Sequence, residues 1–238
     1  MKVLIWFSGW TYSRNFSQAA RPEHRKEFVK CCIDLCIRGS LTTKIWTDTK
    51  SFPGQKRAVY GGDGVAAGIF DGIDSDWERP GTDKGLPGNL HSDDDKKNLP
   101  LLLTEFREQL DALPARQDGG KYLLTAFLPA DPALIKAGWD VPEVVKYLDY
   151  GDLQGYDLHG AFECRESCFN NHQSALHLID GDPSPGKLSV ETAVDAWAKA
   201  GAPVAGRGRG CVARRRRGTC FGRTAWPACP CRSGGWAG

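Results

Sequence analysis

The sequence predicts an α/β fold in which helices cover a sheet of parallel strands. Short apolar runs bounded by turn residues alternate with longer segments in which apolar residues recur at helical spacing. The order along the chain is strand, helix, acidic strand, helix, strand, helix, strand, helix. Parallel neighbours need long crossover connections, and this alternation supplies them. The pattern alone fits a closed barrel and an open, doubly wound sheet equally well.

The four expected strands differ in polarity. Residues 3–7 form a continuous apolar run, as expected of a strand buried on both faces. Residues 70–78 carry four acids between apolar neighbours, and residues 122–128 are again apolar. The last expected strand, residues 150–159, contains Gln154-Gly155-Tyr156-Asp157-Leu158-His159.

Helical spacing predicts a layer of helices between these strands. Pro22 suits the first turn of a helix over 22–37, and Gly39 ends it. Asn98 is placed to cap a helix over 98–113. Shorter helices are expected over 142–147 and 189–200.

Residues 40–66 interrupt this pattern. Most of the segment is polar and rich in turn residues, which indicates an insertion or a lid-type loop. Its run Gly61-Gly62-Asp63-Gly64 lacks the Lys-Ser/Thr that follows a phosphate-binding loop. No nucleotide site is therefore expected here.

The acidic strand is the most informative stretch of the chain. Successive strand side chains point to opposite faces, so Asp74, Asp76 and Glu78 share one face and Asp71 and Trp77 the other. Same-face neighbours lie roughly 7 Å apart. Carboxylates this close cannot all ionise at low cost, so at least one pKa should rise. A carboxyl group that stays protonated near neutral pH is what a general acid requires.

Two structural interpretations of this stretch compete with the catalytic one. It could be a solvated acidic loop, or a loop that binds calcium. A calcium loop needs oxygen ligands from a turning backbone, and Ile73 and Trp77 fit that requirement badly.

The acidic strand also resembles the signature of a known enzyme family. The pattern Asp-x-x-Asp-x-Asp-x-Glu is similar to that of glycoside hydrolase family 18, the chitinases, in its bacterial type. Tyr156-Asp157 resembles a second family motif, on the sixth barrel strand. Trp6-Phe7-Ser8-Gly9-Trp10 resembles Ser-x-Gly-Gly-Trp on the third strand, with Trp6 and Ser8 in place of Ser and Gly.

The resemblance covers about residues 3–203 and implies a (β/α)8 TIM barrel. The strand at residues 3–7 corresponds to the third barrel strand. The barrel is therefore expected to be incomplete in this chain, lacking the first two and the last two strands.

The resemblance further implies hydrolysis of β-1,4 bonds between N-acetylglucosamine units of chitin. The reaction retains configuration and uses the substrate's own acetamide as nucleophile. Glu78 would be the general acid and then the general base. Asp76 would hold the acetamide N–H and stabilise the oxazolinium intermediate, and Asp74 would tune Asp76. Tyr156 would donate to the acetamide carbonyl oxygen, and Asp157 would line the same subsite.

Four other positions of the acidic motif carry no catalytic expectation. Asp71 and Gly72 are expected to be structural. Ser75 and Arg79 depart from the family pattern, which has an apolar residue at the first position and an aromatic residue at the second.

Tryptophans suit a sugar-binding cleft, since sugar rings present apolar faces that stack on aromatic side chains. Trp10 and Trp77 lie at or near strand ends and are expected to contact substrate. Trp139 and Trp197 are expected to pack in the core. No cofactor and no metal are expected.

The chain divides by composition into two parts. Residues 1–205 are expected to form the partial catalytic domain, and residues 206–238 an Arg/Gly/Cys-rich tail. The tail holds eight arginines and no acid or lysine, so the net charge of +2 leaves −6 on the first 205 residues. The composition indicates a disordered or out-of-frame segment. The rival interpretation is a basic segment that binds nucleic acid or an anionic surface.

The expected partners are chitin or chito-oligosaccharides, with no nucleic acid and no membrane. No run approaches the ~20 apolar residues of a membrane span. The resemblance implies an extracellular protein, although no signal peptide is visible. The alternatives are a non-hydrolytic chitin- or glycan-binding relative, an inactive fragment, and a family member that cuts N-glycan cores.

Overall fold

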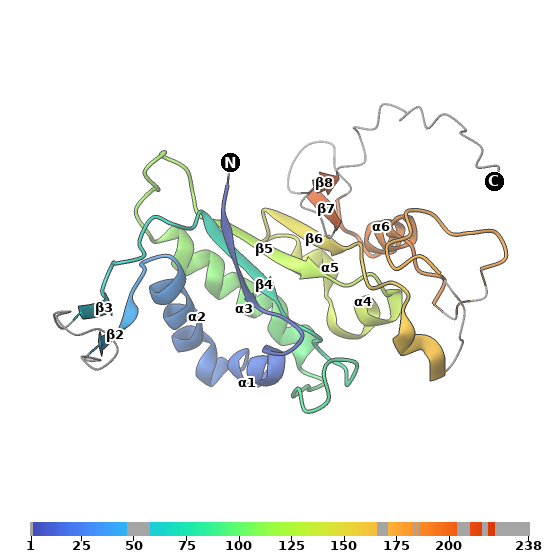
Figure 1. The fold of residues 1–238 in the computed structure, drawn as a ribbon, viewed down its shortest axis with the longest axis horizontal. Coiled ribbons are helices and arrows are strands. Elements are labelled where there is room, and N and C mark those ends of the chain that lie inside the picture. The colour runs from blue at the N-terminus through green and yellow to red at the C-terminus, as the bar shows by residue number, and fades with distance from the viewer. Residues whose placement is uncertain are drawn as a thin grey trace, which may run out of the picture.

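The computed structural model describes residues 2–46, 58–165, 171–182, 184, 186–203, 210–215 and 219–221 (Figure 1). Its centre is a six-stranded sheet in the order β1-β4-β5-β6-β7-β8, and β2 and β3 form a separate two-stranded sheet. The strands are β1 (Leu4–Ser8), β2 (Leu41–Trp46), β3 (Ala58–Gly62), β4 (Gly72–Asp76), β5 (Leu123–Leu128), β6 (Tyr150–Gln154), β7 (Gly210–Arg215) and β8 (Thr219–Phe221).

Strand order in the main sheet follows chain order. The pairs from β1 to β7 are parallel, and β8 pairs antiparallel with β7. A doubly wound sheet reverses its strand order at a switch point. The described strands show no reversal, so the sheet has the topology of a barrel arc.

The helices form one layer whose contacts also follow chain order. Helix α2 packs on α3, α3 packs on α4 and α5, and α4 packs on α6 (Figure 1). No helix in the described ranges is long and apolar enough to span a bilayer. The helices are α1 (Phe16–Ala19), α2 (Pro22–Cys36), α3 (Asp95–Asp111), α4 (Pro132–Gly138), α5 (Val141–Val144) and α6 (Val190–Lys199), with 3₁₀ turns at Ser13–Asn15 and Ala161–Arg165.

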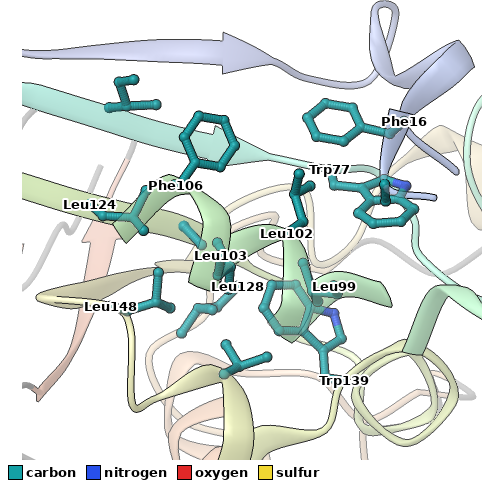
Figure 2. Close-up of a cluster of buried hydrophobic side chains, with 14 of the residues drawn as sticks. Phe16, Trp77, Leu99, Leu102, Leu103, Phe106, Leu124, Leu128, Trp139 and Leu148 are labelled. Atoms are coloured by element: carbon teal, nitrogen blue, oxygen red, sulfur yellow. The ribbon is translucent and has the colours of Figure 1, made fainter. Parts of the chain in front are cut away.

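One hydrophobic core fills the space between this helix layer and the sheet. Figure 2 shows Leu99, Leu102, Leu103 and Phe106 of α3 in this core, together with Leu124 and Leu128 of β5. The core-facing strand residues alternate with others that point to the opposite face. That opposite face carries the acids of β4.

Most predicted helices are confirmed with small shifts. Helix α2 begins at Pro22 as expected, and α6 is capped by Ser189, whose side chain accepts from the Thr192 N–H. Helix α3 begins at Asp95, so the prediction that Asn98 caps it is wrong. Asn98 is instead buried, where its side chain accepts from Arg25 Nη2 at 3.1 Å.

Strand β1 is less buried than its sequence suggests. It is the outer strand of the described sheet, and Trp6 is 45% exposed. The expectation of burial on both faces is therefore wrong. Ser8, which stands where the family motif has glycine, adopts a positive φ of 87°, a conformation that favours glycine.

Two parts of the chain depart from the predicted organisation. The segment expected to be a loop contains the antiparallel pair β2 and β3, while residues 47–57 lie outside the described residues. The expected tail contains β7 and β8, and its interpretation as a disordered or out-of-frame segment stays a prediction. The rest of the tail lies outside the described residues, and the division at residues 205 and 206 stays a prediction.

Candidate active site

Strand β4 places two of the predicted acids side by side on one face. Ile73 is fully buried in the core, so Asp74 and Asp76 point to the opposite face of the sheet. Both are buried there, Asp74 with 4% and Asp76 with 1% of its surface exposed. The alternation predicted for this strand is confirmed for these residues.

Asp74 is held by the neighbouring strand. Thr125 of β5 lies in register with Asp74, and its hydroxyl donates to Asp74 Oδ1 at 2.6 Å. Thr125 is fully buried. The strand pairing therefore fixes both the position and one hydrogen bond of this carboxylate.

Asp76 has the most perturbed carboxyl group of the site. Burial raises the pKa of Asp76 to about 8, and the charges of Glu78 and Asp74 act in the same direction. The charge of Arg79 and a hydrogen bond from the Trp6 side chain oppose this rise. Among the described residues, Asp76 Oδ1 has no hydrogen-bond partner.

Glu78 lies beyond the end of β4, because the strand stops at Asp76 and not at residue 78 as expected. Its backbone is fixed by two side chains from other parts of the chain. The Glu78 N–H donates to Ser13 Oγ at 2.8 Å, and Asn89 Nδ2 donates to the Glu78 carbonyl at 3.0 Å. Ser13 Oγ also donates to the Asp76 carbonyl at 3.2 Å. These contacts position the Glu78 side chain next to the β4 acids.

The Glu78 carboxylate forms an ion pair with its sequence neighbour. Arg79 Nη2 lies 2.7 Å from Glu78 Oε2, and both side chains are nearly buried. Burial raises the pKa of Glu78, and the charge of Asp157 acts in the same direction. The charge of Arg79 and a hydrogen bond from the Trp10 backbone lower this pKa. Burial outweighs the ion pair, so the net direction is upward.

The loop after β1 forms one wall of the site. The Gly9 N–H donates to the Asp76 carbonyl at 3.0 Å, and a Cβ on Gly9 would lie 3.2 Å from Asp76 Oδ2. Trp10 is 44% exposed beside Glu78. Trp6 stacks on Phe127 of β5 with ring centroids 6.5 Å apart.

Residues after β6 approach the site from the other side. The predicted strand over 150–159 ends at Gln154, so Tyr156 and Asp157 lie in the loop that follows. Tyr156 is half-buried, and its charge acts to raise the pKa of Arg79. Asp157 is exposed, and its charge acts to raise the pKa of Glu78. The fold thus brings both members of the second motif near the acidic cluster.

The structure contradicts the expected role of Trp77. This residue is 2% exposed and stacks on Phe16 at 5.3 Å, as Figure 2 shows. It faces the helix layer because its position has the same parity as Ile73. Its ring therefore belongs to the core and not to a substrate cleft. Trp139 and Trp197 pack against each other at 5.1 Å, as predicted.

Asp71 and Gly72 make structural contacts at the start of β4. Asp71 accepts from the Val3 N–H at 2.6 Å and forms an ion pair with Arg116. A Cβ on Gly72 would lie 2.2 Å from the Leu123 carbonyl oxygen, so no side chain fits between β4 and β5 at this point.

Several side chains at the site were not predicted from the sequence. Thr125 and Phe127 could have been identified, because they alternate in β5 and their parity follows from the parallel pairing with β4. Ser13 and Asn89 could not, because their contacts with Glu78 depend on loop geometry. No group of three or more His, Cys, Asp or Glu side chains that could hold a metal ion occurs within the part of the chain that the structure describes.

The arrangement suits proton transfer. It places a buried carboxyl group whose pKa is raised to about 8 beside a second carboxyl with a raised pKa. Such a cluster can hold a proton at neutral pH and release it to a bound molecule. Exposed Trp10 lies beside it, where an aromatic face can stack on a sugar ring.

Comparisons with known proteins identify a family. The family model described as glycosyl hydrolases family 18 matches residues 1–206. Chitinase A1 from Niallia circulans is 30% identical over 209 residues, covering 86% of this chain and 25% of that protein. Mouse chitotriosidase-1 is 30% identical over 208 residues, covering 86% of this chain and 36% of that protein.

Solved structures give the same result. The catalytic domain of the psychrophilic chitinase B from Arthrobacter TAD20 is 47% identical, with a TM-score of 0.70 over 84% of this chain and 43% of that chain. This chain therefore spans less than half the length of each of these relatives. Its parallel sheet and single helix layer are part of a (β/α)8 barrel. With the family match covering most of its length, the chain belongs to glycoside hydrolase family 18.

Proposed function

We propose that this chain carries the catalytic centre of a chitinase that hydrolyses β-1,4 bonds between N-acetylglucosamine units. The observation that carries the proposal is the buried cluster of Asp74, Asp76 and Glu78, two of whose carboxyl groups have raised pKa values. Support for the substrate comes from relatives that are chitinases by name. A solved Group IV chitinase from Ostrinia furnacalis, 26% identical with a TM-score of 0.62, is in complex with allosamidin.

In the first step, the substrate would supply its own nucleophile. Glu78 would protonate the glycosidic oxygen as the acetamide carbonyl oxygen on C2 of the same sugar attacks that sugar's anomeric carbon. The leaving sugar departs as an alcohol, and a positively charged oxazolinium ring remains. Tyr156 would donate a hydrogen bond to the acetamide oxygen and so orient it for attack.

Asp76 and Asp74 would stabilise that positive charge. Asp76 Oδ1, which is buried and has no partner among the described residues, is available to accept the acetamide N–H. Asp74 would share a proton or hydrogen bond with Asp76, and Thr125 keeps Asp74 in place for this task. Ionisation of the pair becomes easier as the oxazolinium charge develops, because an opposite charge favours the carboxylate.

In the second step, Glu78 would act as a base. Its carboxylate would take a proton from water, which attacks the anomeric carbon and opens the oxazolinium ring. Two displacements at the same carbon return the original configuration. Trp10 and Asp157 would line the subsite around the sugar. Because chitin is an insoluble polymer, we infer that the protein meets its substrate outside the cell.

The test is a pair of matched substitutions assayed on chito-oligosaccharides. Glu78→Gln removes the proton donor while keeping the shape, and should lower kcat by about 10²- to 10⁴-fold. Glu108→Gln makes the same change at an exposed position of α3 and should leave kcat unchanged. Equal rates in Glu78→Gln and the parent protein would refute the proposal. Binding of chito-oligosaccharide without cleavage by the parent protein would favour the alternative of a glycan-binding relative.

A further inference from the structure

Arg79 lies inside the candidate active site and has no role in the mechanism proposed above. It is 8% exposed. Its guanidinium pairs with Glu78 Oε2 at 2.7 Å and lies 5.1 Å from the centroid of the Phe127 ring. Its Nη2 also lies 3.4 Å from Gln154 Oε1 at the end of β6. Residues from three adjacent strands or their ends therefore hold this one cation.

The groups around the pair come from every neighbouring element. Asp76 at the end of β4 faces both Glu78 and Arg79. The charges of Asp131, before α4, and Tyr156, after β6, act to raise the pKa of Arg79. The charge of Asp157 acts to raise the pKa of Glu78. Arg79 is the cation that these interactions share.

We propose that Arg79 is a positioning residue that favours the ionised form of Glu78 and so sets the alkaline limit of the activity. The second half of this statement rests on the proposed function, since it requires Glu78 to be the proton donor. The first half concerns only the ion pair.

The ion pair opposes protonation of Glu78. Glu78 can donate a proton only after it has gained one, and protonation removes its attraction to Arg79. A cation in hydrogen-bond contact with a carboxylate favours the ionised form and lowers a carboxyl pKa by about 1 to 3 units. Burial acts on Glu78 in the opposite direction. Arg79 therefore limits how far burial can raise the pH at which Glu78 loses its proton.

The surroundings of the Arg79 guanidinium favour its ion pair with Glu78. The planar group lies over an aromatic ring, an arrangement that stabilises a cation away from water. Among the described residues its Nη1 has no hydrogen-bond partner. The ion pair to Glu78 is therefore a main source of stabilisation for this buried charge.

The test is a titration of the Glu78 carboxyl group by ¹³C NMR in the full chain, with the resonance assigned by its loss in Glu78→Gln. In Arg79→Gln the midpoint should rise by about one pH unit or more. In Arg79→Lys, which keeps the charge, the midpoint should stay close to that of the parent protein. Lys136→Gln removes an exposed cation from α4 and should leave the midpoint unchanged. The same midpoint in Arg79→Gln and the parent protein would overturn the proposal.

A second measurement needs no substitution at Arg79. In the parent protein, the guanidinium ¹⁵N resonances of Arg79 should shift with the same midpoint as the Glu78 carboxyl. Guanidinium resonances that do not respond when Glu78 titrates would overturn the proposal even if Arg79→Gln does not fold.

The pH dependence of kcat/KM on chito-oligosaccharide separates this proposal from the proposed function. The alkaline limb should move upward in Arg79→Gln and stay in place in Arg79→Lys. A parent protein that shows the coupled titration but no hydrolysis would refute the chitinase and leave the ion pair standing. Hydrolysis with an unmoved alkaline limb in Arg79→Gln would refute the role of Arg79 in the pH dependence and leave the chitinase standing.

Discussion

At the scale of single residues, the site depends on acids that are buried more deeply than acids usually are. Asp76 is 1% exposed, and its surroundings contribute two further carboxyl groups and one cation. An isolated buried carboxylate is costly, so the protein keeps the proton instead. The same property that suits catalysis should therefore be measurable as a cost in stability.

The first prediction concerns the pH dependence of that stability. The pKa of Asp76 is raised to about 8 in the folded protein, whereas an aspartate in an unfolded chain ionises near ~3.9. Between these values the folded state holds a proton that the unfolded state has released. The contribution of Asp76 to the free energy of unfolding is therefore fully present below about pH 4 and lost as pH rises toward about pH 8.

Replacing Asp76 by Asn should remove this trend. The free energy of unfolding of Asp76→Asn, relative to the parent protein, should increase from about pH 4 to about pH 8 by at least ~1.4 kcal/mol, the equivalent of one pKa unit. Urea denaturation at a series of pH values measures it. Asp93→Asn, which removes an exposed carboxyl group, is the control. A difference that does not change with pH would show that Asp76 ionises normally.

Sequence reasoning at this scale succeeded where strand alternation decides the outcome. Parity predicts that Asp74 and Asp76 share a face, and the structure agrees. The same rule should have placed Trp77 in the core, since it has the parity of Ile73. Its expected contact with sugar came from its nearness to the strand end and ignored that rule. The ion pair of Arg79 could not be predicted, because strand spacing does not say where a residue after the strand will point.

At the scale of elements, the segment between β4 and α3 decides where Glu78 lies. Asp95, the first residue of α3, is fully buried and accepts three hydrogen bonds. The donors are the Ser17 hydroxyl at 2.6 Å, the Gly81 N–H at 3.1 Å and the Ser92 N–H at 2.9 Å. The Asp95 carboxylate thus links α1, the loop after Arg79 and the start of α3 through hydrogen bonds.

The second prediction tests this connection. Asp95→Ala leaves three donors without their acceptor and should lower the free energy of unfolding by at least about 2 kcal/mol. Asp94→Ala changes the adjacent acid, which is exposed and makes no capping hydrogen bond, and should change it by less than about 0.5 kcal/mol. Thermal or urea denaturation measures both. Equal effects would mean that Asp95 contributes only as a helix-start acid.

The elements themselves were predictable to the extent that local patterns determine them. All four expected strands and the two longest expected helices are present, because apolar spacing is strong in each. Helix α3 begins earlier than expected because Asp95, and not Asn98, joins it to the loop. The β2 and β3 pair was missed because its residues give no clear alternation. Its pairing is a long-range choice that a polar, turn-rich segment does not reveal.

At the scale of the whole molecule, strand order separates a barrel from an open sheet. The pattern of alternating strands and helices left both architectures possible, and the family resemblance favoured the barrel. The structure supports that choice through the chain-order arrangement from β1 to β7 and its single layer of helices. This geometry puts the C-terminal ends of β1, β4 and β6 on one edge, where Trp10, Glu78 and Tyr156 follow.

The central proposal is that Asp74 and Asp76 of β4, with Glu78 just after it, drive a retaining reaction in which the substrate's acetamide is the nucleophile. The direct measurement is the anomeric configuration of the first product formed from a chito-oligosaccharide, followed by ¹H NMR before mutarotation. We predict that the β anomer appears first, since two displacements restore the original configuration. Appearance of the α anomer first, or no hydrolysis at all, would contradict the account.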